Sequence, residues 1–397
     1  MAEDYFTLKL YDDAIYQLYA ALQVDSSNTE ILEFLSDLLV ESGQLDSAVS
    51  LARRLTEKWP DEDRYRSNLA GLYMRLDLMP EAIEQYNVIL EHHPDDKKAL
   101  ISLSTIYIAQ RDFQKALDIS LHLYALDSTD DRVCFTIATL LTELDRAARA
   151  DTFFTRAVEL NPNNPRYFTN WAYLHMNAKD YARAVSVLES GTFHHPRAAD
   201  MWALLGSAYE RADQDSLALR ALDRALELDA SQVGPYITLG FIYDNRGDFD
   251  NALEVYDQAL EIAPDEPLLL NNYAYLLAQR KIRLEEALRM ALRAIEKKPD
   301  NPSYLDTMGW IYYGMGDYQK AREYIEQALE RDPKNPVILE HLGDIFEALG
   351  DKSRARQNWR SALEFDRNNI QLREKLSRLN MREGWQSFYY FAALFFC

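Results

Sequence analysis

One alanine position recurs along almost the whole chain and constrains its architecture more than any other feature. Successive members lie 34 residues apart, with one step of 35 between Ala252 and Ala287. These register alanines are Ala14, Ala48, Ala82, Ala116, Ala150, Ala184, Ala218, Ala252, Ala287, Ala321 and Ala355. A small residue at one phase of a long period marks a close approach of two backbones, and a period of this length is typical of a stacked repeat array. We therefore expect a solenoid that grows by nearest-neighbour stacking instead of one central core.

Each period has the pattern of two amphipathic helices joined by a turn. In residues 233–266, a first helical face is marked by Tyr236, Leu239, Gly240 and Tyr243, and a second by Ala252, Tyr256, Ala259 and Ile262. These spacings fit a period near 3.6 residues. Gly247 lies between the two faces and is suited to the left-handed conformation that ends a helix. The unit is thus predicted to be a helix-turn-helix.

The junctions between units contain the residues that begin helices. Asparagine precedes proline at residues 164–165, 301–302 and 335–336. An asparagine side chain caps the first backbone N–H groups of a helix, and proline fits the first helical position. The step of 35 residues predicts one additional residue near Lys281, Ile282 and Arg283, at the turn between two helices.

This pattern resembles the tetratricopeptide repeat. Residues 302–335 carry it as Leu305, Gly309, Tyr312, Gly316, Ala321, Ala328 and Pro333. The resemblance implies an all-α solenoid of about eleven 34-residue helix-turn-helix repeats that form a right-handed superhelix. It covers residues 1–369, with an incomplete first repeat, followed by a capping helix at 370–383 and an apolar aromatic tail at 384–397. The runs 271–278 and 305–310 look like those of bacterial members.

Charge and motifs narrow the function. The chain has 43 basic and 64 acidic residues, a net charge of −21, which argues against nucleic acid as a partner because phosphate contacts need a basic surface. No phosphate-loop, dinucleotide-binding or hydrolase motif occurs, so we expect neither an enzyme nor a cofactor. Two pairs of adjacent histidines, at 92–93 and 194–195, are too far apart in the sequence to share a metal ion. Each pair is expected at a helix C-terminus, where a histidine interacts favourably with the helix dipole. Cys134 is expected in the core.

The resemblance also implies a groove lined mainly by the first helix of each repeat. At one phase of that helix, four consecutive units carry Arg64, Lys98, Arg132 and Arg166. In so acidic a chain, four cations in register predict a basic row that binds carboxylates or an acidic peptide. The alternative is that each cation pairs with an acid of a neighbouring repeat. Acidic runs near residues 30–41 and 340–347 are interpreted as solvated surface.

Aromatic and amide side chains extend the same face. The candidates are Asn170, Tyr173, Phe241, Trp310 and Tyr313. Exposed aromatics are frequent anchors of protein interfaces. We expect most of these rings to pack between repeats, with Trp310 as the exposed exception.

These observations predict a non-catalytic scaffold or adaptor that binds a protein or peptide segment in its concave groove, as part of the assembly of a multiprotein complex. The alternative is the recognition domain of a larger enzyme or of a bacterial envelope or secretion machine. The tail at 385–397 leaves four interpretations open: packing on the capping helix, docking into a groove of this or a second copy, contact with a membrane interface, or the remnant of a missing domain. The compartment stays open between the cytoplasm and a bacterial periplasm or envelope.

Overall fold

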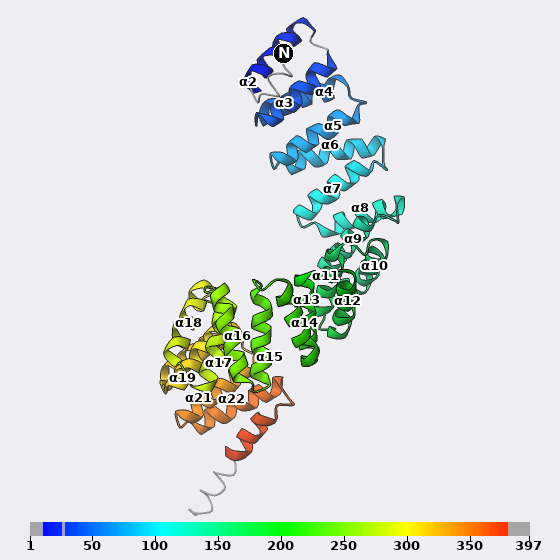
Figure 1. Cartoon of the computed structure of the whole chain (residues 1–397). Coiled ribbons are helices and arrows are strands. Elements are labelled where there is room, and N and C mark those ends of the chain that lie inside the picture. Colours follow the sequence, from blue (N-terminus) through cyan, green and yellow to red (C-terminus); the bar gives the residue numbers. More distant parts are fainter. Residues whose placement is uncertain (1–10, 26–27, 380–397) are drawn as a thin grey trace, which may run out of the picture. The chain divides into compact units, whose positions relative to one another are not determined.

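The computed structural model describes residues 11–25 and 28–379, and the regular secondary structure of these residues is entirely helical. Contacts along the backbone divide the chain into two compact units, residues 1–195 and 196–397. Each unit is built from helix pairs that follow one another in sequence order, so each first helix packs on the second helix of its own repeat (Figure 1). The expected all-α solenoid of repeats is confirmed.

In unit 1 the first helices of the repeats are α3 (Thr29–Glu41), α5 (Asp63–Arg75), α7 (Lys97–Ala109), α9 (Asp131–Glu143) and α11 (Pro165–Asn177). The second helices are α2 (Tyr11–Val24), α4 (Leu45–Lys58), α6 (Met79–His92), α8 (Phe113–Leu126), α10 (Ala147–Leu160) and α12 (Tyr181–His194).

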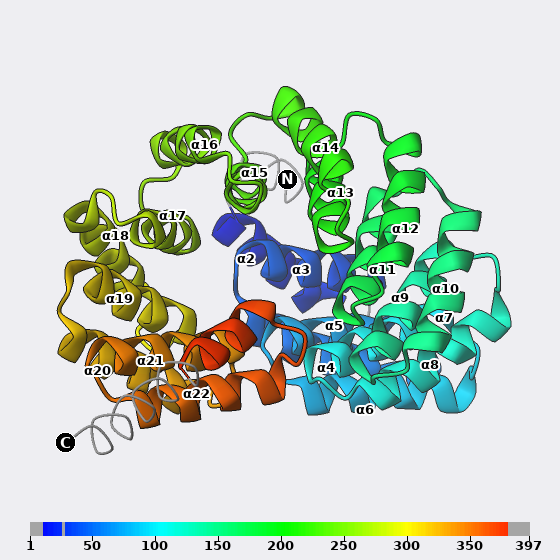
Figure 2. The same ribbon diagram turned by 90° about the horizontal axis from the view of Figure 1, so that it is seen from below.

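In unit 2 the first helices are α13 (Ala199–Arg211), α15 (Val233–Asn245), α17 (Pro267–Arg280), α19 (Pro302–Met315) and α21 (Pro336–Ala348). The second helices are α14 (Asp215–Leu228), α16 (Phe249–Ile262), α18 (Leu284–Lys297), α20 (Tyr318–Arg331) and α22 (Lys352–Phe365). A further helix covers residues 370–379. Figure 2 shows that α15, α17, α19 and α21 lie on the inner side of the curve of this unit, with α16, α18, α20 and α22 outside.

The register alanines are buried in the packing between helices. Each is the fourth residue of a second helix and is 0% exposed. Close packing also explains small residues on the first helices. A Cβ built on Gly240 would lie 2.4 Å from the Tyr256 ring, and one on Gly343 would lie 2.3 Å from the Trp359 ring. Contacts this short do not occur between real carbon atoms, so these positions admit only glycine at the present helix spacing.

Helix ends follow the chemistry expected from the sequence. The side chains of Asn164, Asn301 and Asn335 each accept a hydrogen bond from a backbone N–H of the first helical turn, with proline at the next position. Gly247 has a φ of 74°, the left-handed conformation predicted for that turn. The same conformation is adopted elsewhere by residues such as Asp145, so glycine is not required at every turn.

The additional residue lies where the sequence places it. α17 is followed by a turn at 281–283 before α18 begins at Leu284. Lys281 and Arg283 both have positive φ, 54° and 48°. A second left-handed residue allows the chain to absorb one more residue without disturbing the burial of Ala287.

The two chain ends fall largely outside the described residues. Leu372 and Leu379 of helix 370–379 are buried against α21 and α22. The capping helix at 370–383 stays a prediction. The incomplete start of the first repeat, residues 380–383 and the aromatic tail at 384–397 lie outside the described residues, and their assigned roles stay predictions.

Candidate functional site

The four predicted cations occupy equivalent places on consecutive first helices of unit 1. Arg64, Lys98, Arg132 and Arg166 are the second residues of α5, α7, α9 and α11, and all four are exposed. The four cations therefore occupy one repeated position on consecutive first helices.

The four cations differ in what they already contact. The Arg64 guanidinium lies 3.0 Å from the Glu33 carboxylate of the preceding repeat, which is the neutralised arrangement that the sequence left as the alternative. Arg132 lies 3.0 Å from Asp130, the residue that caps its own helix, and this hydrogen bond lowers the pKa of the Asp130 carboxyl. Within residues 11–25 and 28–379, Lys98 and Arg166 form no ion pair. These two are the cations left available to a partner.

Asn170 lies one turn beyond Arg166 on α11. Its side-chain amide donates to the Arg166 carbonyl at 2.9 Å, and the residue is partly exposed. Tyr173 follows on the same helix and is 52% exposed. Asn170 and Tyr173 therefore extend the surface that begins at Arg166.

The expected burial of the aromatic candidates was wrong. Tyr173 and Phe241 are exposed, while Trp310 is partly buried, its ring stacked 4.6 Å from that of Tyr313 and 4.1 Å from that of His341. The three rings other than Tyr313 occupy the same position, the ninth residue of a first helix. Within unit 2, Trp310 differs from Phe241 because α21, the first helix of the next repeat, places the His341 ring against it.

His341 takes part in a buried polar pair that the sequence analysis missed. Its Nδ1 lies 2.8 Å from the Asp306 carboxylate, and both residues are 6% exposed. Burial alone would lower the pKa of His341, but the charge and hydrogen bond of Asp306 outweigh it and the pKa is raised. Burial acts in the opposite direction on the neighbouring Tyr275, whose pKa it raises because the charged form of tyrosine is the deprotonated one. No short motif in the sequence signals a pair 35 residues apart.

The acidic run near residue 340 is not the solvated surface that the sequence suggested. The Glu340 and Asp344 side chains are 15% and 13% exposed, and both lie within 2.7 Å of the Lys375 ammonium group. Burial raises the pKa of Asp344, against the opposing effect of Lys375. These acids serve to attach helix 370–379 to α21, so they are not free for a ligand.

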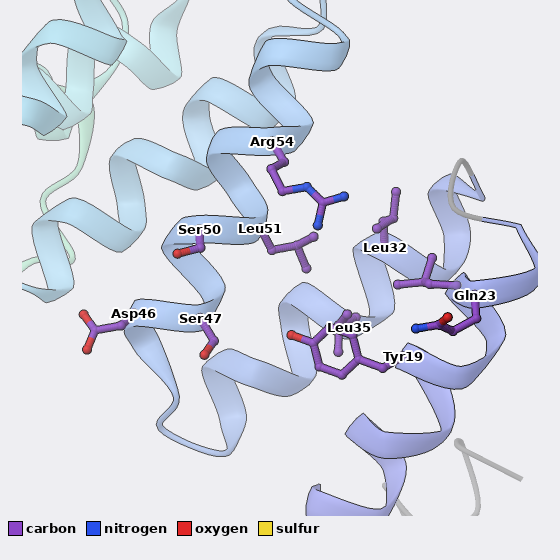
Figure 3. Close-up of a pocket in the computed structure, with 10 residues that line it drawn as sticks. Tyr19, Gln23, Leu32, Leu35, Asp46, Ser47, Ser50, Leu51 and Arg54 are labelled. Carbon is purple, nitrogen blue, oxygen red and sulfur yellow. The ribbon is translucent and has the colours of Figure 1, made fainter.

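Several cavities open on unit 1. The largest of those described, about 610 Å³, lies between α2 and α4 above α3, and Figure 3 shows Tyr19, Asp46 and Arg54 around it. Most of its lining residues belong to the second helices α2 and α4, whereas the basic row lies on first helices. None of its lining residues was predicted to bind, and within the described residues no predicted site residue borders it.

A smaller cavity of about 200 Å³ lies on the face of the first helices, between α7 and α9. It is lined by Ile101, Ser104, Thr105, Ile108, Ser120, Leu123, Asp130, Arg132, Val133 and Thr136. Arg132 is the one predicted site residue among them. The sequence does contain a signal for this cavity, a serine in place of a bulky residue at Ser120, which the search for charged and aromatic patterns passed over.

The remaining predicted features are structural. Cys134 is fully buried, as expected for a core residue, and burial raises the pKa of its thiol. In the described part of the chain no cluster of three or more histidine, cysteine or acidic side chains could hold a metal ion. His195 instead lies 2.9 Å from the Pro162 carbonyl. None of the described helices combines the length and apolarity needed to cross a bilayer.

Comparison with known proteins places these repeats in a family. Two family models, both described as tetratricopeptide repeat, match residues 98–368 and residues 6–72. Two solved structures have a similar fold. The APC/C hetero-tetramer Cut9-Hcn1 is 13% identical with a TM-score of 0.53 over 95% of both chains. A tetratricopeptide repeat protein from Parabacteroides merdae ATCC 43184 is 18% identical with a TM-score of 0.53, covering 63% of this chain and 98% of that one.

The matches to curated relatives cover a smaller share of those proteins. The BBSome complex member BBS4 of Bos taurus is 23% identical over 256 residues, which cover 64% of this chain and 49% of that protein. Superkiller protein 3 of Schizosaccharomyces pombe is 21% identical over 273 residues, 64% of this chain and 20% of that protein. The chain thus spans half or less of the length of these relatives. The bacterial origin indicated by two sequence runs stays a prediction.

Proposed function

The chain belongs to the tetratricopeptide repeat family, and from this premise we propose that it is a non-catalytic scaffold that binds an acidic segment of a partner protein. The proposed surface is the face of the first helices α5, α7, α9 and α11. Relatives named as members of a complex, such as the BBSome complex member BBS4, support a role in assembling proteins. The alternative, a recognition domain of a larger enzyme or envelope machine, stays a prediction.

One observation carries the choice of an acidic partner. Lys98 and Arg166 are exposed, occupy the same position on first helices two repeats apart, and form no ion pair among the described residues. In a chain of net charge −21, two unpaired cations in register offer two available partners for carboxylates on this face. Such a surface attracts carboxylates at short range and excludes basic partners.

The test compares two charge reversals of equal size. The substitution pair Lys98→Glu with Arg166→Glu changes the first-helix face, and Lys115→Glu with Arg149→Glu changes second helices α8 and α10. The probe is a short fluorescein-labelled peptide of glutamate and aspartate residues with one central leucine, followed by fluorescence anisotropy. We expect the first pair to weaken binding by about tenfold or more and the second pair by far less. Equal effects of the two pairs would refute a site on the first-helix face.

A further inference from the structure

The cavity between α7 and α9 has its origin in one sequence position. The residue four places after the register alanine points from the second helix towards the first helix of its own repeat. In most repeats it is bulky: Leu18, Tyr86, Phe154, Leu188, Leu222, Tyr256, Ile325 and Trp359. The exceptions are Ala52, Ser120 and Ala291. A missing bulky side chain leaves space that the helices do not close, since packed interiors relax only partly around a deletion.

Two of these three small residues border a pocket. Ser120 borders the cavity of about 200 Å³ between α7 and α9. Ala52 borders a smaller pocket of about 120 Å³ between α3 and α5. In the former, the Ser104 and Ser120 hydroxyls lie 3.1 Å apart and are almost fully buried. The floor of the cavity between α7 and α9 is therefore formed by two hydrogen-bonded serines, and Ser120 stands where eight of the eleven repeats have a ring or a branched side chain.

The serine and threonine hydroxyl donors in this cavity are already used within the protein. Ser120 Oγ donates to the Ala116 carbonyl at 2.8 Å. Thr105 Oγ1 donates to a carbonyl of α7 at 2.9 Å, and Thr136 Oγ1 donates to the Arg132 carbonyl at the same distance. A polar ligand group entering the cavity would thus find no free hydroxyl donor on Ser120, Thr105 or Thr136. Burying a polar group under such conditions is unfavourable, whereas burying an apolar one is favourable.

The rim combines apolar and charged groups. Ile101 and Ile108 of α7 are 50% and 37% exposed although they are aliphatic. Arg132 lies at the edge of the cavity, held by Asp130, and Lys98 and Arg166 stand at the same position on the helices before and after α9. The volume is below the roughly 300 Å³ at which pockets for drug-sized ligands begin. It matches one side chain of a longer ligand.

We propose that this cavity receives one aliphatic side chain, of the size of leucine, from an acidic segment whose carboxylates pair with Lys98 and Arg166. The proposal rests on the function proposed above and adds an anchor that selects among acidic segments. Charge alone would accept any polyanionic peptide. A cavity whose hydroxyl donors are already used would instead distinguish segments by the residue placed between the acids.

The first experiment measures this selection with two probes. One is the fluorescein-labelled acidic peptide with a central leucine, and the other carries alanine at that position with the same charge. We expect the full-length protein to bind the leucine peptide about tenfold more tightly, because a hydrophobic pocket discriminates against missing methylene groups by at least this factor.

The second experiment fills the cavity with a pair that the chain itself uses. The double substitution Ser104→Ala with Ser120→Leu reproduces Ala172 and Leu188, which occupy the equivalent positions of α11 and α12 and are both 0% exposed. We expect this variant to bind both peptides as the wild type binds the alanine peptide. Ile101→Gln provides a second route that leaves the floor intact. Because Ile101 is half exposed, this variant should fold and lose most of the preference for leucine.

The outcomes separate the two proposals. If both peptides bind the wild type equally and the Lys98→Glu with Arg166→Glu variant loses both, the anchoring cavity is refuted and the acidic-segment function stands. If neither peptide binds the wild type, both proposals fail. A leucine preference that persists in the filled variant and in Ile101→Gln would place the anchor elsewhere and overturn the assignment of this cavity.

Discussion

At the scale of single residues, two glycines show how position within a first helix decides the effect of one methyl group. Gly71 lies in α5 with no atom within 4 Å of a built Cβ, whereas a Cβ on Gly240 would lie 2.4 Å from the Tyr256 ring. We expect Gly71→Ala to raise the free energy of unfolding by about 0.5–1 kcal/mol, since glycine is unfavourable within a helix. Gly240→Ala should lower it by about 1–3 kcal/mol through overpacking. Urea denaturation followed by circular dichroism measures both, and a loss of stability in Gly71→Ala would contradict the assignment.

The pair of His341 and Asp306 makes a second residue-scale prediction, on pH. The pKa of His341 is raised in the folded protein by Asp306 on α19 and by Asp344 and Glu340 on its own helix, with Tyr275 of α17 alongside. A raised folded-state pKa contributes stability below the unfolded pKa, near 6.5, that is lost as pH rises through the higher folded value. Lysine and arginine at the surface do not titrate in this window.

The measurement compares wild type with His341→Gln by urea denaturation from about pH 6 to about pH 9. The wild type should lose part of its advantage over the variant as pH rises. His122→Gln is the matched control, because His122 pairs with Asp95 at 2.8 Å but is 39% exposed. A difference between wild type and His341→Gln that stays constant with pH would mean that the pair is not charged in the folded protein.

At the scale of elements, helix 370–379 depends on one lysine. The Lys375 ammonium lies 2.7 Å from Glu340 and 2.6 Å from Asp344, and all three side chains are less than one quarter exposed. Lys375→Ala leaves two partly buried carboxylates unpaired, which typically costs about 3–5 kcal/mol for fully buried pairs and somewhat less here. Arg378→Ala is the control, since Arg378 is 53% exposed and lies 3.5 Å from Glu347, so it should change stability by less than about 1 kcal/mol.

Hydrogen exchange provides the measurement for this prediction. We expect faster exchange in residues 370–379 and in α21 of Lys375→Ala, because the last helix would detach locally before the repeats unfold. Exchange in α15 should change little, as repeats interact mainly with their neighbours. Faster exchange throughout unit 2 would show instead that Lys375 stabilises the whole stack.

The helices and their register could be predicted because the same physical demand recurs in every repeat. The burial of each register alanine, the capping by Asn164, Asn301 and Asn335, and the additional residue near Lys281 all follow from local spacing. Burial on the first-helix face could not be predicted in this way. Phe241 and Trp310 share a position, but the ring of His341, one repeat after Trp310, stacks on Trp310.

The candidate site, too, could be predicted only in part. The row that contains Lys98 and Arg166 is visible in the sequence because it repeats at one phase. The pairing of Arg64 with Glu33 and of Arg132 with Asp130 depends on side-chain conformations that spacing does not fix. The division between residues 195 and 196 likewise has no counterpart in the alanine register, which continues unchanged from Ala184 to Ala218.

At the scale of the whole molecule, the net charge of −21 makes stability and binding respond to salt in opposite directions. Repulsion between many acidic groups destabilises the folded chain, and added salt screens it. The exposed ion pairs that salt also weakens contribute little each. We therefore expect the melting temperature to rise by a few degrees between about 20 mM and about 300 mM NaCl, as the Debye length falls from about 20 Å to below 8 Å.

Binding of the acidic leucine peptide should weaken over the same range of salt. Its carboxylates gain from direct contact with Lys98 and Arg166, and screening reduces the steering of the peptide towards these cations. The variant with Lys98→Glu and Arg166→Glu is more negative, so its melting temperature should rise more steeply with salt while its residual peptide binding becomes less sensitive to salt. A melting temperature that falls with salt would mean that ion pairs outweigh net repulsion in this chain.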